Sequence, residues 1–184
     1  MKLGQQLVMT PQLQMAIQLL SKPHAEVVAV LREQAAGLRE LNADEVDPLD
    51  ANDLEEGWLW QRLPMLPRLA DQPEPDVWLT GEPLVATANG TLPRFFVDAS
   101  TSREQQFVLR AVRQRARTYE KVAAVLVAAN EAWLRSGAGE ATPVKFRDVA
   151  QKIGMHESTI QRVCGAGVMQ SARGLVRFDA LVAR

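Results

Sequence analysis

Four side chains near residue 160 have the types and spacing needed to read a DNA groove. Arg and Gln pair bidentately with guanine and adenine edges, and Ser and Thr hydroxyls bind phosphates. The surrounding stretch, FRDVAQKIGMHESTIQRVC, favours two short helices joined by a turn, with the second helix starting at Glu157 or Ser158. On that second helix, the side chains that we expect to face DNA are Ser158, Thr159, Gln161 and Arg162.

The same stretch carries the residues that would hold a helix-turn-helix together. This motif needs a small residue where the helices cross, a glycine that turns the chain, and apolar residues that lock the second helix onto the first. The predicted core of the motif is Val149, Ala150, Ile153, Gly154, Ile160 and Val163. A helical hairpin within the core of a bundle has the same pattern, and this alternative stays open.

Charge is segregated along the chain, although the net charge is only −1. Residues 44–76 are rich in acids, whereas residues 100–184 carry an excess of Lys and Arg. A basic part that meets a polyanion would show this asymmetry, and so would a solvated helix face beside an acidic linker. The basic residues that we expect to form a phosphate-facing rim are Lys145, Arg147, Lys152 and Arg173.

Catalysis and metal binding have no motif behind them. The sequence has two histidines and one cysteine, Cys164, without the ligand spacing of a zinc site, and it has neither a P-loop nor a GxGxxG pattern. Acidic runs beside prolines are usually solvated, which argues against an acid/base role for Asp44, Glu45 and Asp47. We therefore expect a protein that is not an enzyme, with no metal and no cofactor.

The elements that must position these residues are mostly helical. Thr10-Pro11 is a typical helix start, and the apolar stripe of Leu13, Ile17 and Leu20 follows it at helical spacing. A second amphipathic run extends to residue 41. Because both apolar stripes are narrow, we expect these helices to need a partner surface and to be loosely held in the isolated protein.

The middle of the chain changes character twice. Residues 42–75 combine acids with prolines and predict a linker, and three short apolar runs near 77–97 predict a small antiparallel sheet. From Ser102 the pattern predicts one long helix, or two broken near Arg117-Thr118, ending at Gly137. The expected fold class is mainly α with a small antiparallel β insert. One cysteine and no long apolar run predict a cytoplasmic protein that does not enter the membrane.

Two motifs resemble those of the sigma-54 (sigma-N) family of bacterial RNA polymerase sigma factors. GMHESTIQRV, with Met169 to Gly174 after it, is similar to the helix-turn-helix signature of that family. The N-terminal LGQQLVMTPQLQMAIQLL resembles its Gln-rich activator-responsive region. The residues that this second likeness singles out are Gln5, Gln6, Leu7, Thr10, Pro11, Gln12, Leu13, Ile17, Leu19 and Leu20.

The resemblance implies a transcription initiation factor that binds core RNA polymerase and promoter DNA and depends on an ATP-driven activator of the enhancer-binding type. It also implies four parts. They are an activator-responsive region at 1–43, an acidic linker at 44–75, a partial core-polymerase-binding domain at 76–140, and a helix-turn-helix region at 141–184.

The sequence is shorter than the family pattern. An early helical portion of the polymerase-binding domain has no counterpart, and the sequence ends ten residues after Gly174, before the domain with the promoter-reading box. We therefore expect a shortened factor. The alternative is a non-initiating interaction protein, either a competitor for polymerase or activator, or a gene remnant.

Overall fold

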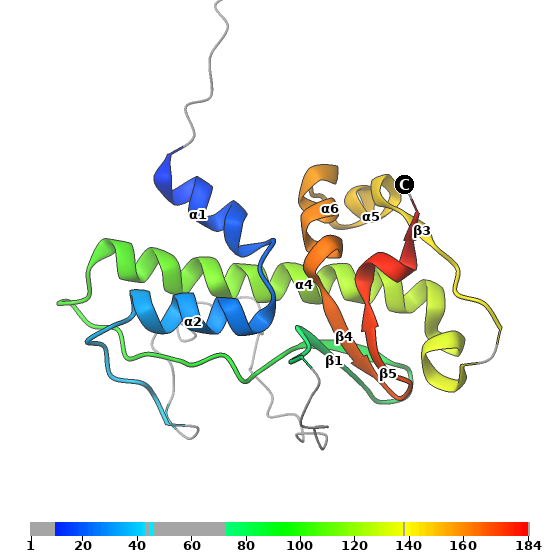
Figure 1. Ribbon diagram of the computed structural model, residues 1–184, viewed down its shortest axis with the longest axis horizontal. Coiled ribbons are helices and arrows are strands. Elements are labelled where there is room, and N and C mark those ends of the chain that lie inside the picture. The colour runs from blue at the N-terminus through cyan, green and yellow to red at the C-terminus, as the bar shows by residue number, and fades with distance from the viewer. Residues whose placement is uncertain (1–9, 43–44, 46–72, 138, 184) are drawn as a thin grey trace, which may run out of the picture.

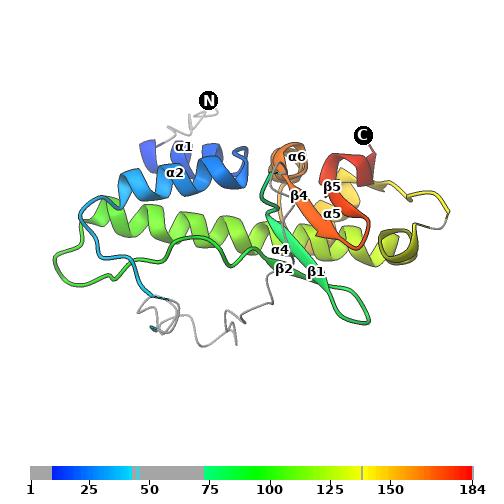
Figure 2. The same ribbon diagram turned by 60° about the horizontal axis from the view of Figure 1, so that its bottom comes forward.

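The computed structural model describes residues 10–42, 45, 73–137 and 139–183 of the chain. A long helix, α4 (Arg103–Ser136), runs along the molecule (Figure 1). Helices α1 (Pro11–Leu19) and α2 (His24–Gln34) lie on its N-terminal half, and the sheet and the remaining helices lie on its C-terminal half (Figure 2). Helix α4 thus joins the two motifs that the sequence singled out.

Helix α4 is continuous through Arg117-Thr118, where the sequence allowed a break. Ser102 and Gln105 form the predicted capping box, and Gly137 ends the helix in the left-handed conformation with φ 73°. The backbone leaves helical geometry at Asn130, whose side chain bonds to Leu126 and to the backbone of Thr142. These bonds tie the loop after α4 back onto the helix.

Helices α1 and α2 are packed onto α4. Thr10 caps α1 by accepting a hydrogen bond from the Leu13 amide, as its sequence position predicted. The buried apolar residues of this N-terminal cluster are Leu19, Val27, Leu31, Ala35, Phe95, Val108, Leu109 and Val112. The partner surface that the narrow stripes require is therefore α4 of the same chain.

The sheet is mixed, so the prediction of a purely antiparallel insert is wrong. Its strands run in the order β2-β1-β4-β5, with antiparallel pairs β1–β2 and β4–β5 and a parallel pair β1–β4. These strands are β1 (Val77–Thr80), β2 (Val85–Ala88), β4 (Val168–Ser171) and β5 (Gly174–Arg177). The free edge of β1 in the β1–β2 pair is occupied by β4, which forms a hairpin with β5.

The apolar run at 95–97 is not a strand of this sheet. Phe95 makes a single bridge to Glu40 and is buried in the N-terminal cluster, while Phe96 is exposed beneath the Arg39 guanidinium. The run is apolar because Phe95 packs against α2 and α4. The apolar run therefore indicated burial and gave no information on strand pairing.

One hydrophobic core joins the C-terminal half of α4 to the sheet and to helices α5 (Phe146–Ile153) and α6 (Glu157–Ala166). The short helix η2 (Phe178–Leu181) completes it, and β3 (Val144–Lys145) pairs in parallel with β6 (Val182–Ala183). Residues 76–140 and 141–184 thus share this core. Most of the predicted linker, 44–75, lies outside the described residues.

Candidate nucleic-acid interface

Helices α5 and α6 form a closely packed pair joined by Gly154. Gly154 ends α5 in the left-handed conformation, with φ 68°, and its amide donates to the carbonyl of Ala150. A residue with a side chain is strained at that φ, which explains the glycine. Of the six predicted core positions, Val149, Ala150, Ile160 and Val163 are buried and Ile153 packs against the same core. Gly154 makes the turn.

Helix α6 begins at Glu157, the first of the two predicted starts, with His156 as its N-cap. The His156 Nδ1 atom accepts from the Ser158 amide at 3.2 Å and lies 2.8 Å from the Ser158 hydroxyl. This contact satisfies one of the free amides that every helix start leaves. His156 therefore acts as a helix cap.

Three of the four predicted DNA-facing side chains lie on the solvent side of α6. Ser158, Gln161 and Arg162 are exposed, whereas Thr159 is half-buried. Gln161 donates to the Glu157 carboxylate at 3.3 Å along the same helix. For Arg162, the described part of the chain shows no ion pair or hydrogen bond, so its guanidinium is available to a partner.

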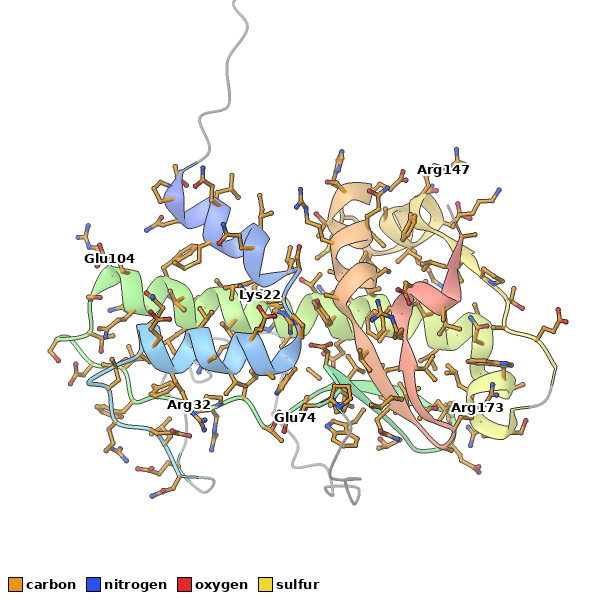
Figure 3. All side chains as sticks on the ribbon, viewed as in Figure 1. Lys22, Arg32, Glu74, Glu104, Arg147 and Arg173 are labelled. Atoms are coloured by element: carbon orange, nitrogen blue, oxygen red, sulfur yellow. The ribbon has the colours of Figure 1, made fainter. Side chains whose placement is uncertain are left out.

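Three of the four predicted rim residues lie on or beside α5. Lys145, Arg147 and Lys152 are all exposed, and Arg147 lies 3.9 Å from Asp148 in a weak surface pair. Arg173 is not near them. It lies at the β4–β5 turn with its guanidinium 4.0 Å above the Trp133 ring, and Figure 3 shows it on the opposite side of this half from Arg147.

Seven of the ten predicted activator-responsive residues lie on or beside α1. Gln5, Gln6 and Leu7 lie outside the described residues. Leu19 is buried against α4, whereas Leu13 remains 41% exposed. Solvent also reaches the amide side chains of α1, so one face of this helix is held by the protein and the other is open. The remaining predicted positions lie on or beside this helix, and they are Thr10, Pro11, Gln12, Ile17 and Leu20.

A buried polar cluster was missed by the sequence analysis. Arg115 is almost fully buried, and its guanidinium pairs with the Asp76 carboxylate at 2.7 Å and stacks over Tyr119. A signal for it was present, because Arg115 lies in the apolar stripe of α4 between Val112 and Tyr119. A charge at such a position requires a buried partner.

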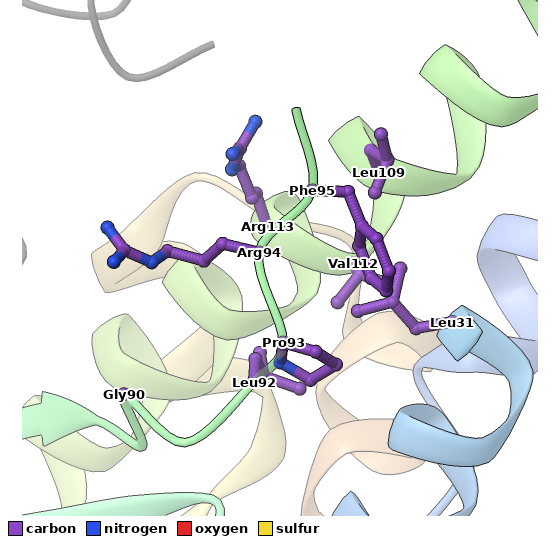
Figure 4. A pocket seen from close by; sticks show the side chains of 9 residues that line it. All are labelled: Leu31, Gly90, Leu92, Pro93, Arg94, Phe95, Leu109, Val112 and Arg113. Atoms are coloured by element: carbon purple, nitrogen blue, oxygen red, sulfur yellow. The ribbon is translucent and has the colours of Figure 1, made fainter. Parts of the chain in front are cut away.

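One pocket among the described residues lies away from α5 and α6. The space inside it, including the part open to solvent, is about 390 Å³, and Figure 4 shows the side chains of Arg94 and Arg113 pointing away from the apolar residues that line it. The lining contains no nucleophile, carboxylate or imidazole, and consists of Leu31, Gly90, Leu92, Pro93, Arg94, Phe95, Leu109, Val112 and Arg113. The arrangement offers packing and charge, without a group that could do chemistry.

The thiol of Cys164 lies in the hydrophobic core. Burial raises the pKa of the Cys164 thiol to about 12, so it stays protonated. The described residues hold no cluster of His, Cys, Asp or Glu that could bind a metal ion. Within the same residues, none of the helices is long and apolar enough to span a membrane.

Comparison with protein families matches the two motif-bearing ends of the chain. Residues 96–184 match the sigma-54 DNA binding domain, a segment that takes in α4 as well as α5 and α6. Residues 1–37 match the activator interacting domain of the sigma-54 factor. The two matches together cover more than half of the chain, which belongs to the sigma-54 family of bacterial RNA polymerase sigma factors.

Individual relatives agree with this assignment. The RNA polymerase sigma-54 factor of Rhizobium meliloti is 44% identical over 69 residues, which are 38% of this chain and 14% of the relative. That of Azorhizobium caulinodans is 32% identical over 128 residues, 56% of this chain and 25% of the relative. The chain therefore matches a quarter or less of the length of these relatives.

A solved structure is also similar. The crystal structure of Aquifex aeolicus sigmaN bound to promoter DNA has a TM-score of 0.45 and 17% sequence identity to this chain. The likeness covers 87% of this chain and 53% of that one.

Proposed function

We propose that this chain is a sigma-54-like transcription initiation factor that reads promoter DNA with α6 while bound to core RNA polymerase. The main support is the geometry of α6, whose buried Ile160 and Val163 lock it onto α5 and α4. That packing leaves Gln161 and Arg162 on the solvent side. A helix-turn-helix presents its second helix to the major groove in this way.

The basic residues near α5 would serve a different purpose. Lys145, Arg147 and Lys152 neutralise phosphates, which strengthens binding to any sequence and makes it sensitive to salt. Arg173, stacked on Trp133, is the one predicted rim residue that this arrangement does not support as a DNA contact. We propose that base reading rests on α6, with Arg162 as its main side chain.

The N-terminal helices would receive an ATP-driven activator. Their support is the match of residues 1–37 to the activator interacting domain and the open face of α1, where Leu13 is exposed. Polymerase docking is proposed for residues 76–140, where the large apolar side chains of Val85 and Phe96 remain exposed. In this role the chain needs no catalysis of its own.

A DNA titration tests the reading helix. Wild type and Arg162→Ala would be titrated with promoter and scrambled duplexes in the presence of core polymerase. We expect Arg162→Ala to lose about 1–3 kcal/mol of discrimination, as for a base-reading Arg. The matched control is Arg32→Ala on α2, which also removes an exposed charge and lies far from α6 (Figure 3). Equal effects of the two substitutions would remove Arg162 from the reading surface.

A further inference from the structure

Asp76 connects three elements of the fold that are distant in sequence. Its side chain is only 2% exposed, and Oδ1 accepts from the guanidinium of Arg115 on α4 at 2.7 Å. The other oxygen, Oδ2, accepts from the Val168 amide at 3.0 Å. The Asp76 backbone amide donates to the Val168 carbonyl at 2.8 Å, and its carbonyl accepts from Asn89. Asp76 lies outside both segments that match the sigma-54 family.

Val168 is the residue at which the chain leaves α6. The residue before it, Gly167, is the C-cap of α6, and its amide donates to the Val163 carbonyl at 2.8 Å. Gly167 is also held from the other side, because its carbonyl accepts from the Phe178 amide and the Phe178 ring packs against its Cα. The C-terminal end of α6 is therefore fixed between Asp76 and η2.

We propose that Asp76 is a positioning residue for the reading helix. Through Arg115 and Val168 it fixes the end of α6 relative to α4, and so sets the angle at which the exposed face of α6 meets DNA. The 10 residues of α6 span about 15 Å, so a small rotation at one end moves Ser158 at the other by ångströms. The DNA part of this inference rests on the proposed reading role of α6.

Hydrogen exchange on the full chain tests the positioning itself. Asp76→Ala removes both side-chain acceptors and should speed exchange at the Val168 amide by about tenfold or more. The control is Val27→Ala, which removes a buried contact in the N-terminal cluster and leaves Asp76 and Val168 unchanged. The same exchange rate at Val168 in both variants would overturn the proposal.

DNA discrimination by the chain bound to core polymerase is the second readout. Asp76→Ala should lower the ratio of promoter to scrambled affinity by about tenfold, the scale of one base contact, while affinity for scrambled DNA stays unchanged. A purely structural loss would lower both affinities together, as expected for Val27→Ala. A discrimination ratio at the wild-type value, despite faster exchange at Val168, would overturn the functional half of the proposal.

A further variant keeps the test decisive if Asp76→Ala does not fold. Asp76→Asn offers one acceptor oxygen, which serves either Arg115 or Val168, and exchange at Val168 should still exceed that in Val27→Ala. Exchange no faster than in that control would overturn the positioning role. If wild type shows no discrimination at all, the reading role of α6 fails, while the exchange result still decides whether Asp76 holds the helix.

Discussion

The Arg115 guanidinium lies 3.9 Å above the ring of Tyr119, one turn further along α4, and both side chains bind the turn between α1 and α2. Arg115 donates to the carbonyl oxygens of Leu19 at 2.8 Å and Lys22 at 2.6 Å. The Tyr119 hydroxyl donates to Leu20 at 2.8 Å. Helix α4 thus holds the N-terminal helices by buried hydrogen bonds as well as by apolar packing.

Tyr119→Phe should loosen the N-terminal helices. The change removes the hydroxyl that donates to Leu20 and keeps the ring, so the free energy of unfolding should fall by about 0.5–1.5 kcal/mol. Urea unfolding measures the change in the free energy of unfolding. Hydrogen exchange should be faster at the α1–α2 turn, with little change in α6. Unchanged exchange at that turn would show that the hydroxyl contributes nothing to holding it.

Ile160→Ala and Arg162→Ala should separate stability from DNA reading. Ile160 is fully buried, so Ile160→Ala should lower the free energy of unfolding by about 2–5 kcal/mol. Arg162 is exposed, so Arg162→Ala should change it little. Thermal unfolding of both variants measures the difference. Similar losses of stability would show that the face of α6 has been assigned wrongly.

Two glycines at the end of α6 should respond oppositely to alanine. A Cβ at Gly167 would lie 2.6 Å from the Phe178 ring and 2.8 Å from the Val163 carbonyl, so Gly167→Ala should destabilise by about 1–3 kcal/mol. A Cβ at Gly165 meets nothing within 4 Å, so Gly165→Ala should stabilise by about 0.5–1 kcal/mol through helix propensity. Denaturant unfolding measures the free energy of unfolding of both variants. Equal changes in this free energy would contradict the close packing at Gly167.

Glu120 should make stability depend on pH. Burial against the sheet raises the pKa of its carboxyl from 4.5 to about 7, despite the Ala88 amide, Arg117 and Lys121 nearby. Because the folded pKa lies above the unfolded one, the stabilisation is complete below about pH 4.5 and is lost as the pH rises through about 7.

Glu120→Gln removes this dependence, since the amide stays neutral. Wild type and variant should melt at similar temperatures near pH 5, and the variant should be the more stable near pH 8. Thermal unfolding at both pH values measures the difference in melting temperature between wild type and variant. The other titrating groups are the same in both proteins, so their effects cancel in this difference. A constant difference between the two proteins across this range would contradict the raised pKa.

Local signals in the sequence predicted the helices well. Thr10-Pro11, the Ser102–Gln105 capping box and Gly137 each act through contacts a few residues away, so their effects do not depend on the rest of the fold. The same holds for Gly154, which turns the chain between α5 and α6. The exposed positions of Ser158, Gln161 and Arg162 on α6 agree with the helix-turn-helix pattern, whereas Thr159 is half-buried.

Long-range pairing could not be predicted in this way. The parallel contact of β1 with β4 joins residues about ninety positions apart, and no local pattern at Val77 or Met169 reports it. Arg115 was a visible anomaly in an apolar stripe, yet its partner Asp76 could not be chosen among the many acids before β1. Arg173 was assigned to the rim by charge, and its contact with Trp133 depends on the β4–β5 turn.

The most direct test of the central claim is a titration of the full chain against promoter and scrambled duplexes across salt, with and without core RNA polymerase. Alone, the chain should bind both duplexes weakly, in the range of about 10⁻⁴ to 10⁻⁶ M, with strong salt dependence. With core polymerase it should select the promoter, because polymerase holds α6 at a fixed distance from the start site. Polymerase binding without promoter selection would instead favour a competitor that does not initiate. Tight promoter-selective binding by the chain alone would contradict the account and indicate an independent DNA-binding repressor.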